Sequence, residues 1–206
     1  MHGERAFTSV RPVVTAVRSR GRVNVEVELD ERAWRVLPLA AVAKAGLANG
    51  VIVDRERARA LNRALRAERA FVAATRLLRH SDQTTAMLET KLAHRGVGIA
   101  EREKVVKTLT DARVVDDMRF ARLRAEALSG RLYGNEAIRH DLAGRGIVGA
   151  TAQAAVAELE PEATRIDRVV QTRGLSPQTL AFLARRGFST EALEALVARV
   201  EADGLG

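Results

Sequence analysis

The chain has 206 residues, of which 47% are hydrophobic and only 3% aromatic, and it contains no cysteine. The absence of cysteine excludes disulfides, thiolate metal sites and cysteine nucleophiles, and the aliphatic composition favours closely packed helices. No segment resembles a secretion signal or approaches the roughly 18 uncharged apolar residues of a membrane-spanning helix, so we expect a cytoplasmic chain without membrane contact.

The formal charge of +8 is unevenly distributed. Residues 54–157 carry 20 basic and 13 acidic side chains, whereas residues 158–206 carry 6 and 8. A basic middle region is typical of a chain that contacts a polyanion with part of its surface. Arginine-rich surfaces without such a function also occur in proteins encoded by GC-rich genomes.

The N-terminal region, residues 1–53, is predicted to be β-rich. Apolar and polar residues alternate strictly over 22–29, which indicates a half-buried strand, and 13–18 is a second β-branched run. Residues 34–37 can add a third short strand. Pro38 then opens a short helix that we expect to close near Asn49 and Gly50.

From Asp54 onward the spacing of apolar residues becomes helical, with Asp54 as the N-cap of an amphipathic helix. Arginines line much of its polar face. Most such faces are only solvated, but this one could also meet a nucleic acid or an acidic protein.

Nearly the same six residues occur three times, as LAHRGV, LAGRGI and LARRGF. Each copy predicts a helix stop, with the glycine in the left-handed conformation and the arginine as the C-cap. The leucine four residues before the glycine should then contact the apolar residue that follows the glycine. The three predicted stops comprise Leu92, Gly96 and Val97; Leu142, Gly146 and Ile147; and Leu183, Gly187 and Phe188.

Alignment on these glycines predicts another apolar-striped helix after each stop, containing Val106, Val156 and Val197. The preceding helix of each copy should start at Ser81-Asp82, Gly134-Asn135 and Ser176-Pro177. We therefore predict a mainly α fold of tandem three-helix, helix-turn-helix-like repeats in an elongated array. The expected boundaries are 54–115 for a linker helix with the first repeat, 116–160 for the second and 161–206 for the third.

The segment ARVVDDMRFAR stands between the first two repeats. With Asp116 as N-cap, Val115 and Phe120 take the positions of a hydrophobic staple, and Asp117 places negative charge in the first helical turn. Paired carboxylates could instead bind a metal or act as acid and base, but neither has a partner nearby in sequence.

These motifs resemble the RecX family of bacterial recombination regulators over about residues 70–200. The family's G-Y-L-D-D-x-R-F-A segment is present from Asp116 to Ala121, although its Gly-Tyr-Leu part reads Arg-Val-Val here. The pattern I-R-x-x-L-x-x-[KR]-G-I is intact from Ile138 to Ile147. The N-terminal strands look like the extra β region of some members.

The resemblance implies a non-enzymatic regulator of DNA repair, recombination and the SOS response. Family members bind the RecA recombinase filament on single-stranded DNA and suppress its ATP hydrolysis and strand exchange. It implies the RecA filament and single-stranded DNA as partners, with weak, nonspecific contact to double-stranded DNA. We expect a monomer without cofactor, metal or catalytic residues.

The arginines of the basic middle region are expected to supply the electrostatic part of binding. They are Arg76, Arg79, Arg119, Arg122, Arg124, Arg131, Arg139 and Arg145. The main alternative is a helix-turn-helix DNA-binding protein, although the residues that would begin its recognition helices are poor readers of base edges. An enzyme is disfavoured because no phosphate-binding loop or zinc-binding histidine pair is present in the sequence.

Overall fold

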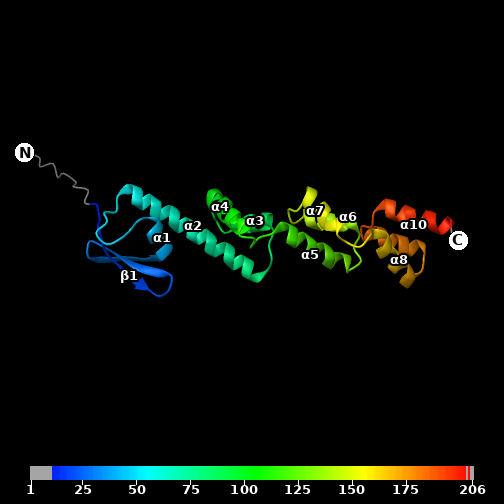
Figure 1. The fold of residues 1–206 in the computed structure, drawn as a ribbon, viewed down its shortest axis with the longest axis horizontal. Coiled ribbons are helices and arrows are strands. Elements are labelled where there is room, and N and C mark those ends of the chain that lie inside the picture. The colour runs from blue at the N-terminus through cyan, green and yellow to red at the C-terminus, as the bar shows by residue number, and fades with distance from the viewer. Residues whose placement is uncertain (1–10, 203, 205–206) are drawn as a thin grey trace, which may run out of the picture. The chain divides into compact units, whose positions relative to one another are not determined.

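The computed structural model describes residues 11–202 and 204, and it is mainly helical over these residues, with ten helices and three strands (Figure 1). The expected fold class, mainly α with a small N-terminal β region, is confirmed. Residues 1–10 of the predicted β region and 203, 205 and 206 of the predicted third repeat lie outside the described residues.

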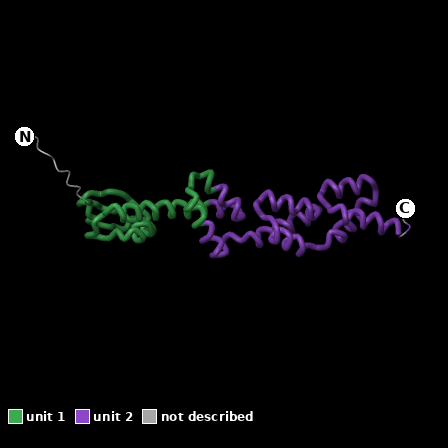
Figure 2. Tube along the Cα trace, turned by 90° about the horizontal axis from the view of Figure 1, so that it is seen from above, with its two compact units in different colours: residues 1–76, 92–105 green, residues 77–91, 106–206 purple. Residues whose placement is uncertain are grey.

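Contacts between Cα atoms divide the chain into two compact units (Figure 2). Unit 1 comprises residues 1–76 and 92–105, and unit 2 comprises residues 77–91 and 106–206. The finer division at residues 53, 115 and 160 stays a prediction.

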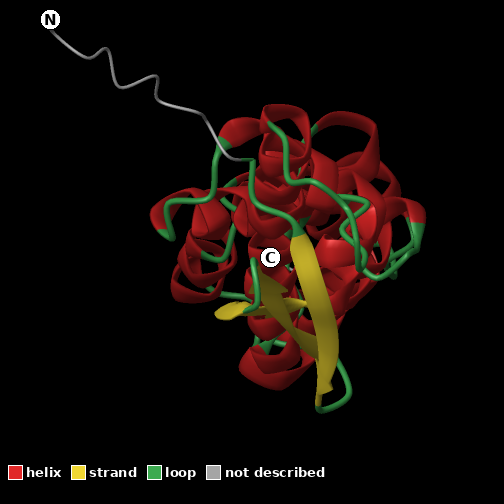
Figure 3. Ribbon diagram, turned by 90° about the vertical axis from the view of Figure 1, so that its left-hand side faces the viewer, coloured by secondary structure: helices red, strands yellow, loops and turns green. Residues whose placement is uncertain are grey.

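Unit 1 contains an antiparallel sheet in the order β1-β2-β3 (Figure 3), formed by β1 (Val14–Arg20), β2 (Asn24–Leu29) and β3 (Arg32–Pro38). All three predicted strands are therefore present. The alternating valines of β2 point into a core that α1 (Leu39–Lys44) and the first turns of α2 (Arg55–His80) complete. A three-stranded sheet needs such a helical partner to bury its apolar face.

Helix α1 follows Pro38 as predicted but ends at Lys44, well before Asn49 and Gly50. Gly46 has a φ of 63°, and the Leu47 N–H donates to the Val42 carbonyl at 3.1 Å. Helix α1 thus ends in the same kind of stop that the sequence predicts for the three hexapeptides. The N-cap prediction for α2 is confirmed, because Asp54 Oδ1 accepts from the Arg57 N–H at 2.8 Å.

Eight shorter helices follow α2. They are α3 (Thr85–His94), α4 (Ile99–Asp111), α5 (Asp117–Ser129), α6 (Asn135–Ala143), α7 (Gly149–Ala157), α8 (Glu162–Arg173), α9 (Pro177–Arg185) and α10 (Thr190–Ala202). Within unit 2, one core is formed by α5, α6 and α7 and another by α8, α9 and α10. The fully buried Ala121 and Ala125 allow the helices of the first of these cores to approach closely.

The three hexapeptides form the predicted helix stops, except that α6 has Gly144 and not Arg145 as its C-cap. Gly96, Gly146 and Gly187 have φ angles of 72°, 79° and 75°. In each copy the amide of the residue after the glycine donates to the carbonyl of the leucine, at 3.1 Å from Val97, 3.0 Å from Ile147 and 3.2 Å from Phe188. All three leucines are completely buried, so each stop also anchors the end of its helix in a core.

Two of the glycine turns also contact the start of an earlier helix. In the 84/146 junction, the Thr84 hydroxyl donates to the Arg145 carbonyl at 2.6 Å, and a Cβ added to Gly146 would overlap the Cβ of Ala86. Asp117 Oδ1 accepts from the Thr85 amide at 2.8 Å. The start of α3 is therefore held by the α6–α7 turn and by the first residue of α5.

The 134/187 junction repeats this arrangement one three-helix group further along. The Gly134 amide donates to the Arg186 carbonyl at 2.8 Å, and the Glu136 amide donates to the Gly187 carbonyl at 3.0 Å. Glu162, the first residue of α8, accepts from the Asn135 amide at 2.6 Å. Amides at a helix start have no partner within the helix, so both junctions satisfy groups that would otherwise need water or a local cap.

Two sequence predictions about these helices are wrong. Helix α3 starts at Thr85 with Thr84 as its cap, since the Thr84 hydroxyl accepts from the Met87 amide at 3.1 Å, whereas Ser81-Asp82 was the expected start. Thr84 is favoured as the N-cap because its hydroxyl makes two hydrogen bonds at once: it accepts from the Met87 amide and donates to the Arg145 carbonyl. The second concerns the apolar stripe of α10, in which the sequence places Val197. Val197 is 36% exposed, and the neighbouring Leu196 fills the core in its place.

We predict that alanine substitution of the three turn glycines has unequal costs. The Cβ added by Gly96→Ala meets no atom within 4 Å. This variant should therefore lose only about 1 kcal/mol of the free energy of unfolding, from the strain of alanine in a left-handed conformation. Gly146→Ala and Gly187→Ala add a clash with Ala86 or Ala137, which raises the cost to about 2–4 kcal/mol. Urea unfolding of the three variants measures this, and equal losses at all three positions would contradict the junction geometry.

Candidate nucleic-acid and protein interface

The eight arginines of the predicted electrostatic set lie on several elements. Arg76 and Arg79 are in the last turns of α2, while Arg119, Arg122 and Arg124 are on α5. Arg131 follows α5, Arg139 is on α6 and Arg145 is in the α6–α7 turn. Only Arg124 and Arg145 are half-buried, and the other six are exposed.

The structure brings Arg124 and Arg145 together around one carboxylate. Asp141 on α6 accepts two hydrogen bonds of 2.8 Å from Arg124 and one of 2.9 Å from Arg145. The hydrogen bonds from Arg124, followed by those from Arg145, hold the pKa of Asp141 well below its usual range. These two arginines therefore fasten α5 and the α6–α7 turn to α6, and the carboxylate offsets one of their two positive charges.

Two more members of the set pair with acidic residues at the surface. Arg122 Nη2 lies 2.6 Å from Glu158 Oε1, and Arg119 Nη2 lies 3.9 Å from Asp82 Oδ1. Exposed pairs of this kind contribute little to stability and exchange readily for another anion. Arg119 and Arg122 thus stay available to a polyanion at small cost.

The other four arginines of the set, Arg76, Arg79, Arg131 and Arg139, form no ion pair with any residue that the structure describes. Their full charge faces solvent, which is the state that phosphate or carboxylate groups of a partner can neutralise. Within each unit, these side chains are the strongest candidates of the set for contact with a polyanion.

The paired carboxylates Asp116 and Asp117 serve as helix caps. Asp116 Oδ1 accepts from the Arg119 amide at 3.0 Å, and this bond lowers the pKa of Asp116. Val115 is buried and Phe120 packs against the α5–α7 core, at the positions predicted for a hydrophobic staple. Asp117 does more than expected, since it also caps α3 in the 84/146 junction. Among the described residues, no group of His, Cys, Asp and Glu side chains could hold a metal ion.

Sequence reasoning missed Arg165, which is 1% exposed in the 134/187 junction. Its guanidinium donates to the Tyr133 carbonyl at 2.8 Å, to the Glu160 carbonyl at 3.2 Å and to Asn135 Oδ1. Burial lowers the pKa of Arg165. Arg165 is the fourth residue of α8, as Phe120 is of α5. That equivalence to the staple position is the one signal in the sequence that could have indicated burial.

We predict that Asp141→Asn lowers the free energy of unfolding at pH 7 by about 1–2 kcal/mol, because both arginines lose their charged acceptor. The lowered pKa of Asp141 means that its contribution is present above about pH 4 and is lost as the pH falls through the folded-state pKa. Urea unfolding between pH 3 and pH 7 should show a constant difference above about pH 4 and a difference that narrows, without vanishing, towards pH 3, because the folded-state pKa lies lower still.

Asp111→Asn is the matched control for this variant, because Asp111 forms an exposed pair with Lys107 on α4. It should change stability by less than about 0.5 kcal/mol. An equally small effect of Asp141→Asn would show that the cluster does not hold the three segments together.

No helix within the described residues is long and apolar enough to span a membrane. No protein-family model matches the chain. A curated relative, Regulatory protein RecX of Mycobacterium leprae (strain Br4923), is 29% identical over 153 residues, which cover 67% of this chain and 90% of the relative.

Two crystal structures share the fold. A regulatory protein RecX matches with a TM-score of 0.76 at 18% identity, over 89% of this chain and 97% of the matched chain. RecX from Lactobacillus salivarius matches with a TM-score of 0.55 at 17% identity, over 66% of this chain and 97% of the matched chain. The resemblance to the RecX family that the motifs predict is therefore confirmed, and the chain is RecX-like in sequence and in fold.

Proposed function

We propose that this chain is a RecX-type regulator that binds the RecA filament on single-stranded DNA and inhibits its ATPase and strand-exchange activities. The observation that carries the proposal is the RecX-like sequence and fold of the chain. The exposed, unpaired arginines support it, since a nucleoprotein filament presents phosphates and acidic protein surface together. A cytoplasmic location and a non-enzymatic role are parts of the same proposal.

We assign the electrostatic attraction of the partner to arginines that do not hold the fold together. Arg131 and Arg139 lie in or beside the α5–α7 group and have no acidic partner among the described residues. Arg124 and Arg145 are needed to hold Asp141. Reversal of Arg124 would therefore confuse loss of binding with loss of folding, whereas Arg131 and Arg139 can be tested without that ambiguity.

A helix-turn-helix DNA-binding protein is the second candidate function. The helix after a glycine turn would be its recognition helix, and α7 begins with Gly149, Ala150 and Thr151. Helix α10 begins with Thr190 and Glu191. These residues are poor ligands for base edges and phosphates, so the helix starts do not favour sequence-specific binding.

The ATPase of RecA on single-stranded DNA tests the proposal, with the chain added after filaments have formed. We expect inhibition well below one molecule per RecA protomer, because a regulator of the filament acts at few sites. Inhibition that begins only when the chain can coat the DNA would indicate competition for phosphate. No inhibition at any ratio would reject a regulator of the RecA filament.

Charge reversal gives the second test. Arg139→Glu and Arg131→Glu, made singly, should each weaken binding to RecA filaments and reduce the slope of log affinity against log salt by about 1. Arg185→Glu is the matched control, an exposed arginine of α9 without an ion pair among the described residues. If Arg185→Glu has the same effect as Arg139→Glu, net charge alone governs binding and the assignment of these two arginines is wrong.

A further inference from the structure

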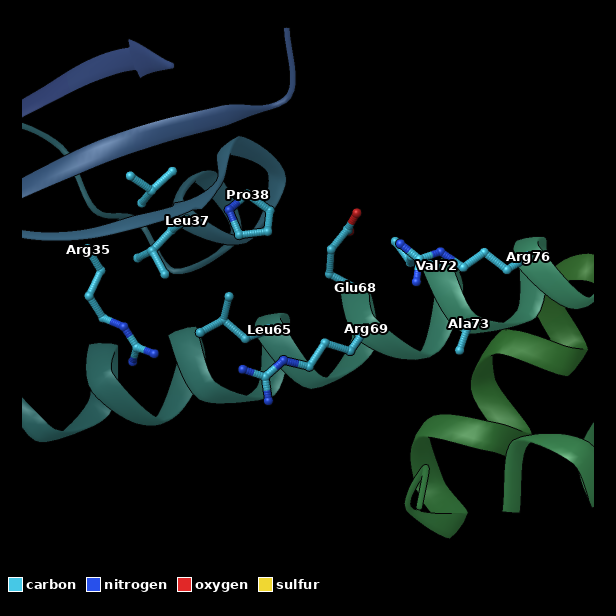
Figure 4. Close-up of a pocket in the computed structure, with 10 residues that line it drawn as sticks. Arg35, Leu37, Pro38, Leu65, Glu68, Arg69, Val72, Ala73 and Arg76 are labelled. Atoms are coloured by element: carbon cyan, nitrogen blue, oxygen red, sulfur yellow. The ribbon is translucent and has the colours of Figure 1, made fainter. Parts of the chain in front are cut away.

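A groove lies between β3 and α2 in unit 1 (Figure 4). We call it the α2–β3 groove. Its volume is about 380 Å³. It is lined by Arg35, Val36, Leu37 and Pro38 of β3 and by Leu65, Glu68, Arg69, Val72, Ala73 and Arg76 of α2.

The floor of the groove is aliphatic and open to solvent. Val72 is 37% exposed, and Leu65 and Pro38 continue the apolar surface beside it. Val36 lines the groove with its backbone, because residues of a strand alternate between faces and the neighbouring Leu37 is the one buried against α2. In Figure 4 the side chains of Leu37 and Leu65 occupy the space between β3 and α2. An apolar surface in this position favours a partner that brings at least one apolar side chain.

Three cations surround this floor. Arg35, Arg69 and Arg76 form no ion pair with any described residue, and the single acid of the lining, Glu68, is likewise unpaired within that part of the chain. The groove therefore carries an excess of positive charge around an apolar centre. A ligand that complements this groove has an apolar side chain flanked by carboxylates.

The groove also includes a backbone edge. The Leu39 amide donates to the Val23 carbonyl at 2.9 Å, and Val36 is paired with Glu26. Because hydrogen-bonded and non-hydrogen-bonded pairs alternate in antiparallel sheets, the N–H and C=O of Val36 point away from β2. The opposite edge of the sheet is covered at the start of β1, where the Val14 amide donates to the Val51 carbonyl at 2.8 Å.

Pro38 has no N–H and a bulge interrupts β3 opposite Val27 and Glu28, so this edge offers backbone pairing only around Val36. A long added strand is therefore disfavoured, and a short segment that is extended where it passes Val36 fits. Nucleic acid is less suitable, because base stacking needs exposed rings and the groove lining contains no aromatic residue.

We propose that the α2–β3 groove binds a short acidic segment of a partner protein. An apolar side chain of the segment rests on Pro38, Leu65 and Val72, and flanking carboxylates pair with Arg35, Arg69 and Arg76. The inference goes beyond the proposed function, because it specifies a peptide-binding site by its chemistry and holds whichever protein supplies the segment.

Fluorescence polarisation with the full chain tests the site. The probe is a labelled seven-residue peptide, Gly-Glu-Leu-Asp-Val-Glu-Gly, and the companion probe replaces its Leu and Val with Ser. We expect saturable binding of the first peptide and at least about tenfold weaker binding of the second, because the companion has charge but no anchor.

The double variant Arg69→Glu with Arg76→Glu should weaken binding of the first peptide at least about tenfold. Its matched control is Arg55→Glu with Arg59→Glu, which makes the same charge change on exposed arginines of α2 outside the groove. A melting curve for each variant confirms that unit 1 still folds. The control variant should bind the peptide within about twofold of the unaltered chain.

Three results would overturn the proposal. The first is no saturable binding to the unaltered chain. The second is equal loss in the two double variants, which would indicate unspecific attraction to a basic helix. The third is displacement of the peptide by a 15-nucleotide oligo(dT) whose own binding depends on Arg69 and Arg76, which would make the groove a nucleic-acid site.

Discussion

The contact on which unit 2 depends is that of a glycine turn with the start of an earlier helix. It occurs at Gly146 against the start of α3 and at Gly187 against the start of α6. In both places the carbonyl of the arginine before the glycine accepts a hydrogen bond, and an acidic residue at the start of the next group accepts another. Apart from the Thr84 hydroxyl, the donors are amides that a helix cannot satisfy alone, so each group of helices completes the one before it. The left-handed glycine is needed twice over, for its φ angle and for the absence of a Cβ.

This arrangement divides the arginines of the chain into two classes. Arg145 binds Asp141, Arg165 is buried among carbonyls, and Arg186 stacks 4.6 Å from the centre of the Tyr133 ring. Such residues maintain the geometry of the repeats. We propose that exposed arginines with neither an ion pair nor a packing role among the described residues, such as Arg131 and Arg139, carry the attraction to a partner. Substitution of these arginines should then alter binding without loss of the fold.

Local signals in the sequence were sufficient for the strands, for most helix starts and for the three glycine stops, because each depends on residues within one or two turns. Contacts between distant segments were not predictable. Thr84 was missed in favour of Ser81-Asp82, since its second bond, to Arg145, exists only in the folded chain. The pairing of Arg124 with Asp141 and the burial of Arg165 have the same cause. Arg113 and Leu132 adopt left-handed angles of 56° and 61° without being glycine, so no composition signal marks those two turns.

If the 134/187 junction is a persistent part of the native structure, amide hydrogen exchange followed residue by residue will detect it. The amides of Gly134, Asn135 and Glu136 bond to Arg186, Glu162 and Gly187, all beyond their own helix. We expect these three amides to exchange as slowly as the amide of Ile138, which donates to the carbonyl of the N-cap residue Gly134. Exchange at the rate of an unprotected peptide at Gly134 and Glu136, with Ile138 protected, would contradict it, because the α8–α10 group would then detach freely from α6.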